Sequence, residues 1–148
     1  MKPLVAALKD GDTIRAVIRN TGVNQDGKTP GISFPSKDAQ ERLIRTVYEG
    51  AGLNPLHTTY VEAHGIGTQA GDPIKTSAIS AAISHGREDA LLIGSVKSNV
   101  GHTGGASGIM GLIKCVLMLE NGVILPSRNF ETPNKRIPLE IWKIKVPR

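Results

Sequence analysis

Apolar residues recur along the chain in two alternating patterns, short β-rich runs and longer runs with helical spacing. The runs lie at residues 13–19, 37–50, 59–62, 73–85, 91–96 and 106–121. This alternation predicts an α/β fold with helices on both faces of a sheet. Residues 122–126 and 139–146 add extended segments among prolines, so we expect a mixed sheet rather than a purely parallel one.

The two longest helical patterns differ in how much cover they require. The helix at 37–50 follows Ser36, a suitable N-cap, carries acids in its first turn and is apolar on one face only. The pattern at 106–121 is apolar nearly all round, and glycines at its start permit close backbone approach. A chain this short cannot surround such a helix, so we expect something large to pack against it.

The length and composition of the chain indicate one globular unit. A chain of 148 residues with 39% hydrophobic content can bury one core, and we expect a single domain with a poorly defined N-terminal segment at 1–11. The loop at 21–36 is rich in Gly, Asn, Asp and Pro, and loops of this length are usually functional or disordered.

Cysteine usage and charge narrow the class of protein further. The single cysteine, Cys115, excludes a disulfide framework, and with four scattered histidines it predicts no structural metal site. The apolar stretch at 3–8 is too short for a signal peptide or membrane span, so we expect a soluble cytoplasmic protein. The net charge of +5 is dispersed and aromatic residues make up only 3%, which indicates an acidic partner rather than nucleic acid.

Two loops carry the candidate chemistry. Residues 61–73 follow a short strand and open a helix with Asp72 as N-cap, which places His64 at the carboxyl end of the strand. Residues 92–105 repeat this plan and place His102 just before the buried helix. Such loops form the sites of open α/β sheets. A helix N-terminus disfavours imidazolium, so we expect a neutral His102 that donates a hydrogen bond to a developing oxyanion.

These loops and two further blocks carry a family resemblance. The blocks are residues 61–73 (VEAHGIGTQAGDP), 97–108 (KSNVGHTGGASG), 21–36 (TGVNQDGKTPGISFPS) and 129–147 (NFETPNKRIPLEIWKIKVP). They resemble the histidine motifs, the preceding loop and the closing segment of β-ketoacyl synthases, in particular the ketosynthase domains of polyketide synthases.

The resemblance implies a thiolase-like fold of two similar α/β halves, of which residues 1–148 would supply the second as a partial domain. It also implies a decarboxylative Claisen condensation of acyl and malonyl thioesters. His64 and His102 would then stabilise the enolate oxygen, Lys97 would orient and tune His102, and Thr68 and Asn99 would contact the phosphopantetheine arm. The implied partners are an acyl carrier protein and the first ketosynthase half, within a homodimer, and no directly bound cofactor is implied.

The family's cysteine nucleophile has no counterpart in this sequence. Cys115 lies in the middle of the apolar helix, where a thiol behaves as a small apolar side chain. We therefore expect the isolated chain to be inactive.

Three positions depart from the family's pattern inside the loops. Ile66 replaces a threonine, Lys75 replaces a glutamate after the Gly-Asp-Pro turn, and Gly104 replaces a glutamate after the second histidine. Lys75 and Lys97 should repel each other, so the polar network around Lys97 cannot survive unchanged. The departures are either natural variation or relaxed constraint, as in a truncated gene, a decaying copy or a mispredicted gene.

Two alternative hypotheses, which assign the chain to other classes of protein, stay open at this stage. Residues 103–109 resemble the phosphate loop of short-chain dehydrogenases, but Met110 stands where that loop continues with glycine, and a lone glycine loop is a weak signal. Alternatively, the chain is a non-catalytic half-domain that pairs with a ketosynthase half or a carrier protein.

Overall fold

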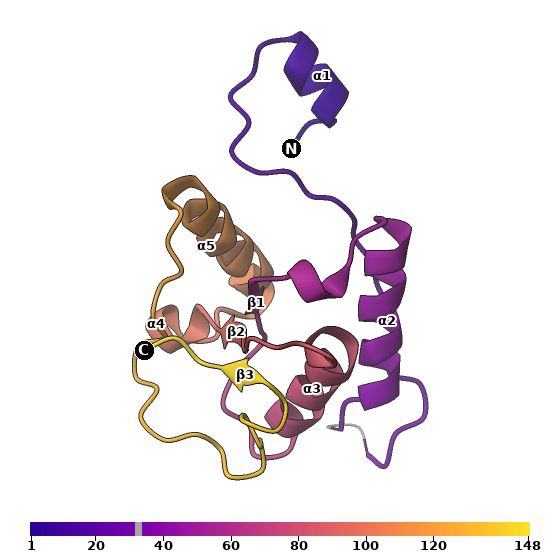
Figure 1. Ribbon diagram of the computed structural model, residues 1–148, viewed down its shortest axis with the longest axis vertical. Coiled ribbons are helices and arrows are strands. Elements are labelled where there is room, and N and C mark those ends of the chain that lie inside the picture. Colours follow the sequence, from indigo (N-terminus) through magenta and orange to yellow (C-terminus); the bar gives the residue numbers. More distant parts are fainter. Residues whose placement is uncertain (32–33) are drawn as a thin grey trace.

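The computed structural model describes residues 1–31 and 34–148 and places three strands between two groups of helices (Figure 1). The helices are α1 (Leu4–Lys9), α2 (Lys37–Gly50), α3 (Gly71–Ile79), α4 (Lys97–Val100) and α5 (Ser107–Asn121). The strands are β1 (Tyr60–Glu62), β2 (Leu91–Gly94) and β3 (Ile144–Lys145). Three short turns complete the set: η1 (Pro55–His57), the π-helical η2 (Ser80–Ser84) and η3 (Gly104–Ala106).

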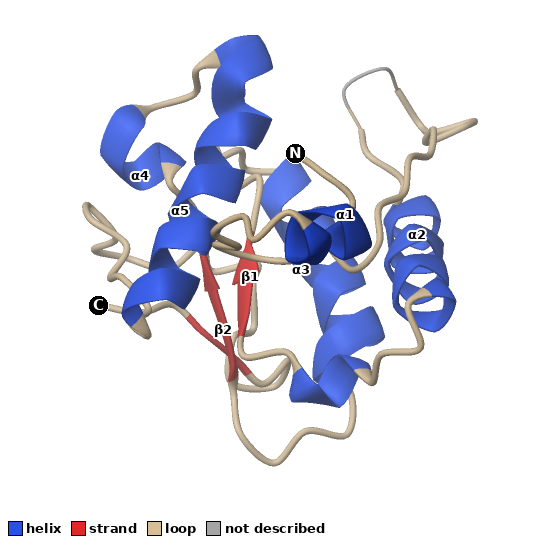
Figure 2. Cartoon of the chain, turned by 90° about the horizontal axis from the view of Figure 1, so that it is seen from above, coloured by secondary structure: helices blue, strands red, loops and turns tan. Residues whose placement is uncertain are grey.

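The sheet has the order β1-β2-β3, and both strand pairs are parallel. Helices α4 and α5 lie on one face, and α2 and α3 lie on the other (Figure 2). The α/β class with helices on both faces is therefore confirmed. The expectation of a mixed sheet was wrong for the described residues: 122–126 form no strand, and α5 with a long loop carries the chain back far enough for β3 to pair in parallel.

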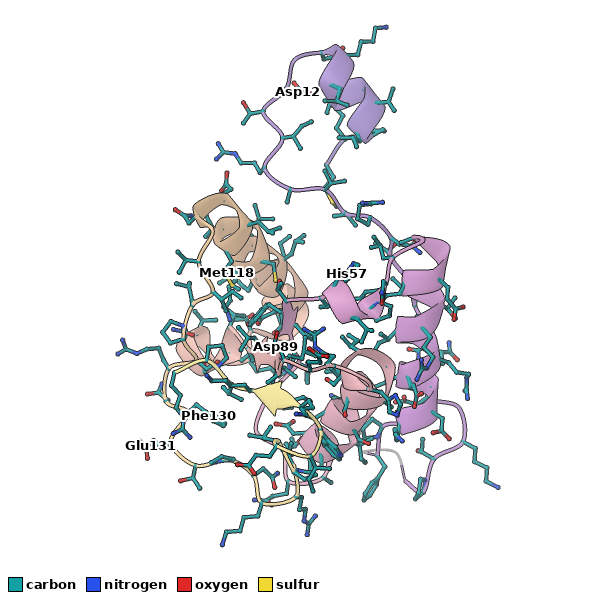
Figure 3. All side chains as sticks on the ribbon, in the orientation of Figure 1. Asp12, His57, Asp89, Met118, Phe130 and Glu131 are labelled. Atoms are coloured by element: carbon teal, nitrogen blue, oxygen red, sulfur yellow. The ribbon has the colours of Figure 1, made fainter. Side chains whose placement is uncertain are left out.

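The segment before α2 also differs from expectation. Residues 13–19 form no strand, because no neighbouring strand pairs with them, and Val17 and Ile18 expose 44% and 50% of their surface. Residues 1–11, which we expected to be a poorly defined N-terminal segment, contain α1, which stands apart from the rest together with Asp12 (Figures 1 and 3). Within this segment the Lys2 ammonium forms ion pairs with the carboxylates of Asp10 and Asp12, each at 2.6 Å.

A small core joins the sheet to α2 and α3. Leu91 of β2 is fully buried against Ala82 and Ile83, and Ile44 and Tyr48 of α2 pack on this cluster. As the sequence predicts, α2 begins after Ser36, whose hydroxyl accepts a hydrogen bond from the Ala39 amide at 3.2 Å. The core therefore fixes the strand ends from which the histidine loops emerge.

Helix α5 turns its apolar side away from the rest of the chain. Its buried residues are Ser107, Gly111, Lys114 and Met118, of which Met118 is labelled in Figure 3. The opposite side carries Ile109, Ile113 and Leu117, which expose 52%, 47% and 49% of their surface. Since an apolar helix face is normally buried, this arrangement leaves the predicted contact surface of α5 open.

The exposed area of the chain is large for its size. It exposes 10005 Å², whereas a folded monomer of 15.7 kDa exposes about 7300 Å². The outlying N-terminal segment and the open face of α5 both contribute to this excess. An excess of this order is in the range that obligate protein interfaces bury.

We expect the purified chain to bind the hydrophobic dye anilinonaphthalene sulfonate at α5, because soluble monomers rarely expose a contiguous apolar helix face. The substitution Leu117→Glu should reduce the dye fluorescence. Val5→Glu makes a comparable change at an exposed position of α1 and should leave most of the signal. A native chain that elutes as a monomer and binds no dye would contradict this description of α5.

Candidate active site

His64 and His102 come together at the carboxyl end of the sheet. Their ring centroids lie 5.2 Å apart and the ring planes are nearly perpendicular, at 84°. His64 follows β1 by two residues, and His102 lies in the loop between α4 and α5. The structure therefore confirms the predicted places of His64, at the carboxyl end of a strand, and of His102, just before the long helix.

Ser95, which the sequence analysis missed, holds the His64 loop against the end of β2. Its buried hydroxyl donates to the His64 carbonyl at 3.3 Å and accepts from the Lys97 amide at 3.3 Å. The loop approaches closely because Gly65 has a φ of +45°, and a Cβ there would lie 2.7 Å from the Ser95 Cβ. A serine directly after a buried strand is a common pattern, so the sequence alone did not single it out.

A second serine holds the ring of His102. The Ser107 hydroxyl at the start of α5 lies 2.7 Å from His102 Nδ1 and 3.3 Å from the Thr103 hydroxyl. Within the described part of the chain, Nδ1 is thus occupied and Nε2 is the nitrogen left for a ligand. Ser107 stands five residues after His102, a spacing that signals nothing by itself until the helix start is known.

The surroundings of His64 favour its neutral form. Burial lowers its pKa below the ordinary value of 6.5, and the charges of Lys75, Lys97 and His102 lower the pKa further, while Asp72 opposes them. At pH 7 the ring is therefore mostly uncharged and carries one N–H. Such a group can donate a hydrogen bond to an oxygen that gains negative charge.

Lys97 begins α4 and lines the same cavity as the two histidines. Among residues 1–31 and 34–148, neither its ammonium nor that of Lys75 pairs with a carboxylate. Both lysines act on His64 through their charge. The expected action of Lys97 on His102 stays a prediction.

Asp72 does not cap α3 as expected. The helix begins one residue earlier, at Gly71, and Asp72 turns its carboxylate back to accept from the Gly67 amide at 3.0 Å and the Thr68 hydroxyl at 3.2 Å. The loop thereby uses the carboxylate that the sequence assigned to the helix end. The Thr68 hydroxyl is engaged within its own loop.

Asn99 lies on α4 with an exposed side chain, whose Oδ1 accepts a hydrogen bond from the Ser98 hydroxyl at 3.1 Å. Neither Asn99 nor Thr68 is among the residues that line the histidine cavity. Their contact with a phosphopantetheine arm stays a prediction.

A cavity of about 1500 Å³ opens in front of the two rings. Besides both histidines and both lysines, its walls include Asn24, Gln25 and Asp26 of the 21–36 loop and Arg128 and Phe130 of the C-terminal segment. The loop is held to α2, where the Asn24 amide group donates to the Ala39 carbonyl at 2.8 Å. The loop thus forms part of the cavity wall, and its function stays a prediction; residues 32–33 lie outside the described part of the chain.

Cys115 lies inside α5 and is partly buried. Burial, followed by the charge of Glu62, raises the pKa of its thiol above the ordinary value. A nucleophilic cysteine needs the opposite environment, one that stabilises the thiolate.

Two further properties concern the whole described chain. Residues 1–31 and 34–148 contain no cluster of three or more His, Cys, Asp or Glu side chains that could hold a metal ion. No helix in these residues has both the length and the apolar character needed to cross a membrane.

The three departures from the ketosynthase pattern have distinct consequences here. Ile66 and Lys75 both line the cavity. Gly104 has a φ of +58°, a left-handed conformation in which a glutamate would be strained. The backbone at 104 is thus adapted to glycine, whereas position 75 offers a helical site that accepts glutamate.

We expect Lys75→Glu to raise the pKa of His64, because it replaces a charge that opposes imidazolium by one that favours it. The imidazole titration followed by NMR measures this directly. Lys9→Glu, the same charge reversal on α1, should leave the titration midpoint of His64 unchanged. An unchanged midpoint in Lys75→Glu would show that Lys75 does not act on the ring.

Comparison with known proteins places this geometry in a family. The family model described as beta-ketoacyl synthase, C-terminal domain, matches residues 15–131. The reducing polyketide synthase PKS1 of Cochliobolus heterostrophus is 63% identical over 147 residues, and the highly reducing polyketide synthase phiA of a fungal species is 62% identical over 149 residues. The aligned region covers 99% of this chain but only 6% of either relative.

Solved structures agree with this assignment. The ketosynthase from module 6 of the bacillaene synthase of Bacillus subtilis matches with a TM-score of 0.89 and 42% identity, over 93% of this chain and 25% of that one. The oxazolomycin ketosynthase domain OzmH KS7 of Streptomyces albus matches with a TM-score of 0.93 and 37% identity, over 99% of this chain and 26% of that one. The glycine-rich stretch at 103–109 falls inside the family match over residues 15–131, which leaves the dehydrogenase hypothesis without support. The chain belongs to the β-ketoacyl synthase C-terminal domain family and has the thiolase-like ketosynthase fold.

Proposed function

We propose that this chain supplies the two-histidine half of a polyketide synthase ketosynthase site, of the 3-oxoacyl-carrier-protein synthase type. The observation that carries the proposal is the convergence of the His64 and His102 rings, 5.2 Å apart, on one cavity. Two imidazole N–H groups at this separation can donate to a single oxygen atom placed between them.

The proposed reaction is a decarboxylative condensation. In a malonyl thioester, the bond between the α-carbon and the carboxylate carbon breaks and CO₂ leaves. The electron pair of that bond stays with the α-carbon and is delocalised onto the thioester oxygen, which gives the enolate. His64 and His102 stabilise the enolate oxygen with their hydrogen bonds. The enolate carbon then attacks an acyl thioester, a new C–C bond forms and the acyl group's C–S bond breaks, releasing the thiolate that carried it.

The thiolate in this scheme belongs to a cysteine outside these residues. The raised pKa of Cys115 and its place within α5 make it unsuitable. The open apolar face of α5, with Ile113 and Leu117 at its centre, is where we propose that the first ketosynthase half packs. The intact enzyme would be a homodimer.

The malonyl group arrives on the phosphopantetheine arm of an acyl carrier protein in this proposal. The chain has a net charge of +5 and would therefore attract a carrier protein that is acidic. Thr68 and Asn99, both exposed beside the site, are the proposed contacts of the arm. The free thiol of Cys115 is consistent with a protein that functions in the reducing cytoplasm.

A second candidate function follows from the same open face. A half-domain whose α5 is exposed but whose site has gained Lys75 could pair with a ketosynthase half or a carrier protein without catalysing the reaction. Such a protein would keep the interface and lose the chemistry.

We expect the isolated chain to release no CO₂ from a malonyl-carrier thioester, since it lacks a partner half for the substrate cavity. In a synthase such as PKS1 of C. heterostrophus whose matching segment is replaced by this chain, CO₂ release should depend on the histidines. His102→Ala should lower the rate by about 10²-fold, as the loss of one oxyanion donor does. His57→Ala on η1 (Figure 3) is the matched control and should have little effect, because His57 does not line the cavity.

Three outcomes separate the candidates. Histidine-dependent CO₂ release in the segment-swapped synthase supports the catalytic proposal. A swapped synthase that assembles but is equally inactive with and without the histidines supports the non-catalytic half-domain. CO₂ release by the isolated chain that His102→Ala abolishes would overturn the expectation that the chain needs a partner.

A further inference from the structure

A buried ion pair beneath the site has no part in the chemistry proposed above. Lys114 Nζ of α5 lies 2.8 Å from Glu62 Oε2 of β1, and the two side chains are only 7% and 11% exposed. Lys114 also donates to the Tyr60 hydroxyl at 2.7 Å, and that hydroxyl donates to Glu62 Oε2 at 2.6 Å. The three side chains form a closed network between the sheet and α5.

The position of Lys114 runs against the pattern of its helix. On α5 the apolar Ile113 and Leu117 face outward, while the charged Lys114 faces the sheet. Burying two charges is costly, and such a pair contributes little net stability compared with apolar residues of similar volume. The pair therefore calls for an explanation other than stability alone.

Glu62 connects the three segments that carry the site. It lies two residues before His64 in the chain. Its other oxygen, Oε1, accepts a hydrogen bond from the amide of Val96, the residue before Lys97. Through Oε2 it holds Lys114, which lies seven residues, or about two helical turns, after the Ser107 that contacts the His102 ring.

The packing around this network leaves the carboxylate little freedom. A Cβ at Gly111, one turn before Lys114, would lie 3.1 Å from Glu62 Cγ. A Cβ at Gly94, at the end of β2, would lie 2.6 Å from the Tyr60 hydroxyl. The two glycines thus bring α5 and β2 close enough to hold the network in a single arrangement.

We propose that the Glu62–Lys114 pair is a positioning device that fixes the separation of the His64 and His102 rings. Glu62 sets the direction in which the chain leaves β1 toward His64, and Lys114 fixes α5, whose first residue holds His102. The pair itself touches no reacting atom. Its catalytic meaning rests on the proposed function, but the positions of the rings can be measured without substrate.

The test separates ring position from stability. In the 148-residue chain, NMR reads the NOE between the two imidazole rings and their titration midpoints, and thermal unfolding reads stability. The variants are Glu62→Gln, Lys114→Met and the double variant. Glu41→Gln, which removes the acid of the exposed ion pair with Arg45 on α2, is the matched control.

We expect both single variants to lose the inter-ring NOE and to be less stable, since each leaves a buried polar group without its partner. The double variant should recover stability, because no uncompensated charge remains, and should still lack the NOE. Glu41→Gln should keep both properties at native values. A role limited to stability would return the NOE together with the melting temperature.

The proposal is overturned if the double variant or Glu62→Gln retains the native NOE and the native His64 midpoint. If Lys114→Met does not fold, Glu62→Gln alone tests the proposal. We expect this variant to fold, because glutamine keeps the shape of the side chain and its hydrogen-bonding capacity. Failure of the segment-swapped synthase to use its histidines would contradict the proposed function but would leave this result unchanged.

Discussion

The carboxylate of Glu62 is the point at which the segments of the candidate site meet. One oxygen holds the turn that leads to Lys97, and the other holds α5 through Lys114. Because Glu62 also ends β1, its position sets where the His64 loop begins. Ser95 and Ser107 then complete the arrangement by holding the His64 backbone and the His102 ring. The site thus depends on a polar network between the sheet and α5.

Local signals were enough to predict much of the fold and the site. The N-cap of α2, the alternation of strands and helices, and the two histidine loops each depend on short stretches of sequence whose preferences agree with the fold. The direction of β3 could not be read in this way, because it depends on a crossover of about 50 residues through α5. The same holds for residues 13–19, whose composition suits a strand but which have no partner to pair with.

Helix α5 shows most clearly where reading the sequence alone fails. Its apolar character was evident, but a helix that is apolar nearly all round does not reveal which side faces its own sheet. Lys114 is the one charged residue in the middle of that helix, and Glu62 precedes His64 by two residues. Together these two charges were the available signal of a buried pair, and only their proximity in space made it interpretable.

The departures at Lys75 and Gly104 change the charge beside the site, and the two rings converge in their presence. Burial, followed by the charges of Lys75 and Lys97, lowers the pKa of His64 and so favours its neutral form. A neutral imidazole is the form that donates to an enolate oxygen, so the departures oppose protonation of the ring without removing its donor. They therefore do not by themselves argue against chemistry at this site.

A crystal structure of the segment-swapped synthase with a malonyl thioester analogue that cannot lose CO₂ would show which groups bind the thioester oxygen. We expect this oxygen to lie within about 3 Å of a ring nitrogen of both His64 and His102. An oxygen bound by backbone amides alone, with either ring turned away from it, would contradict the proposal that the two histidines act on one atom.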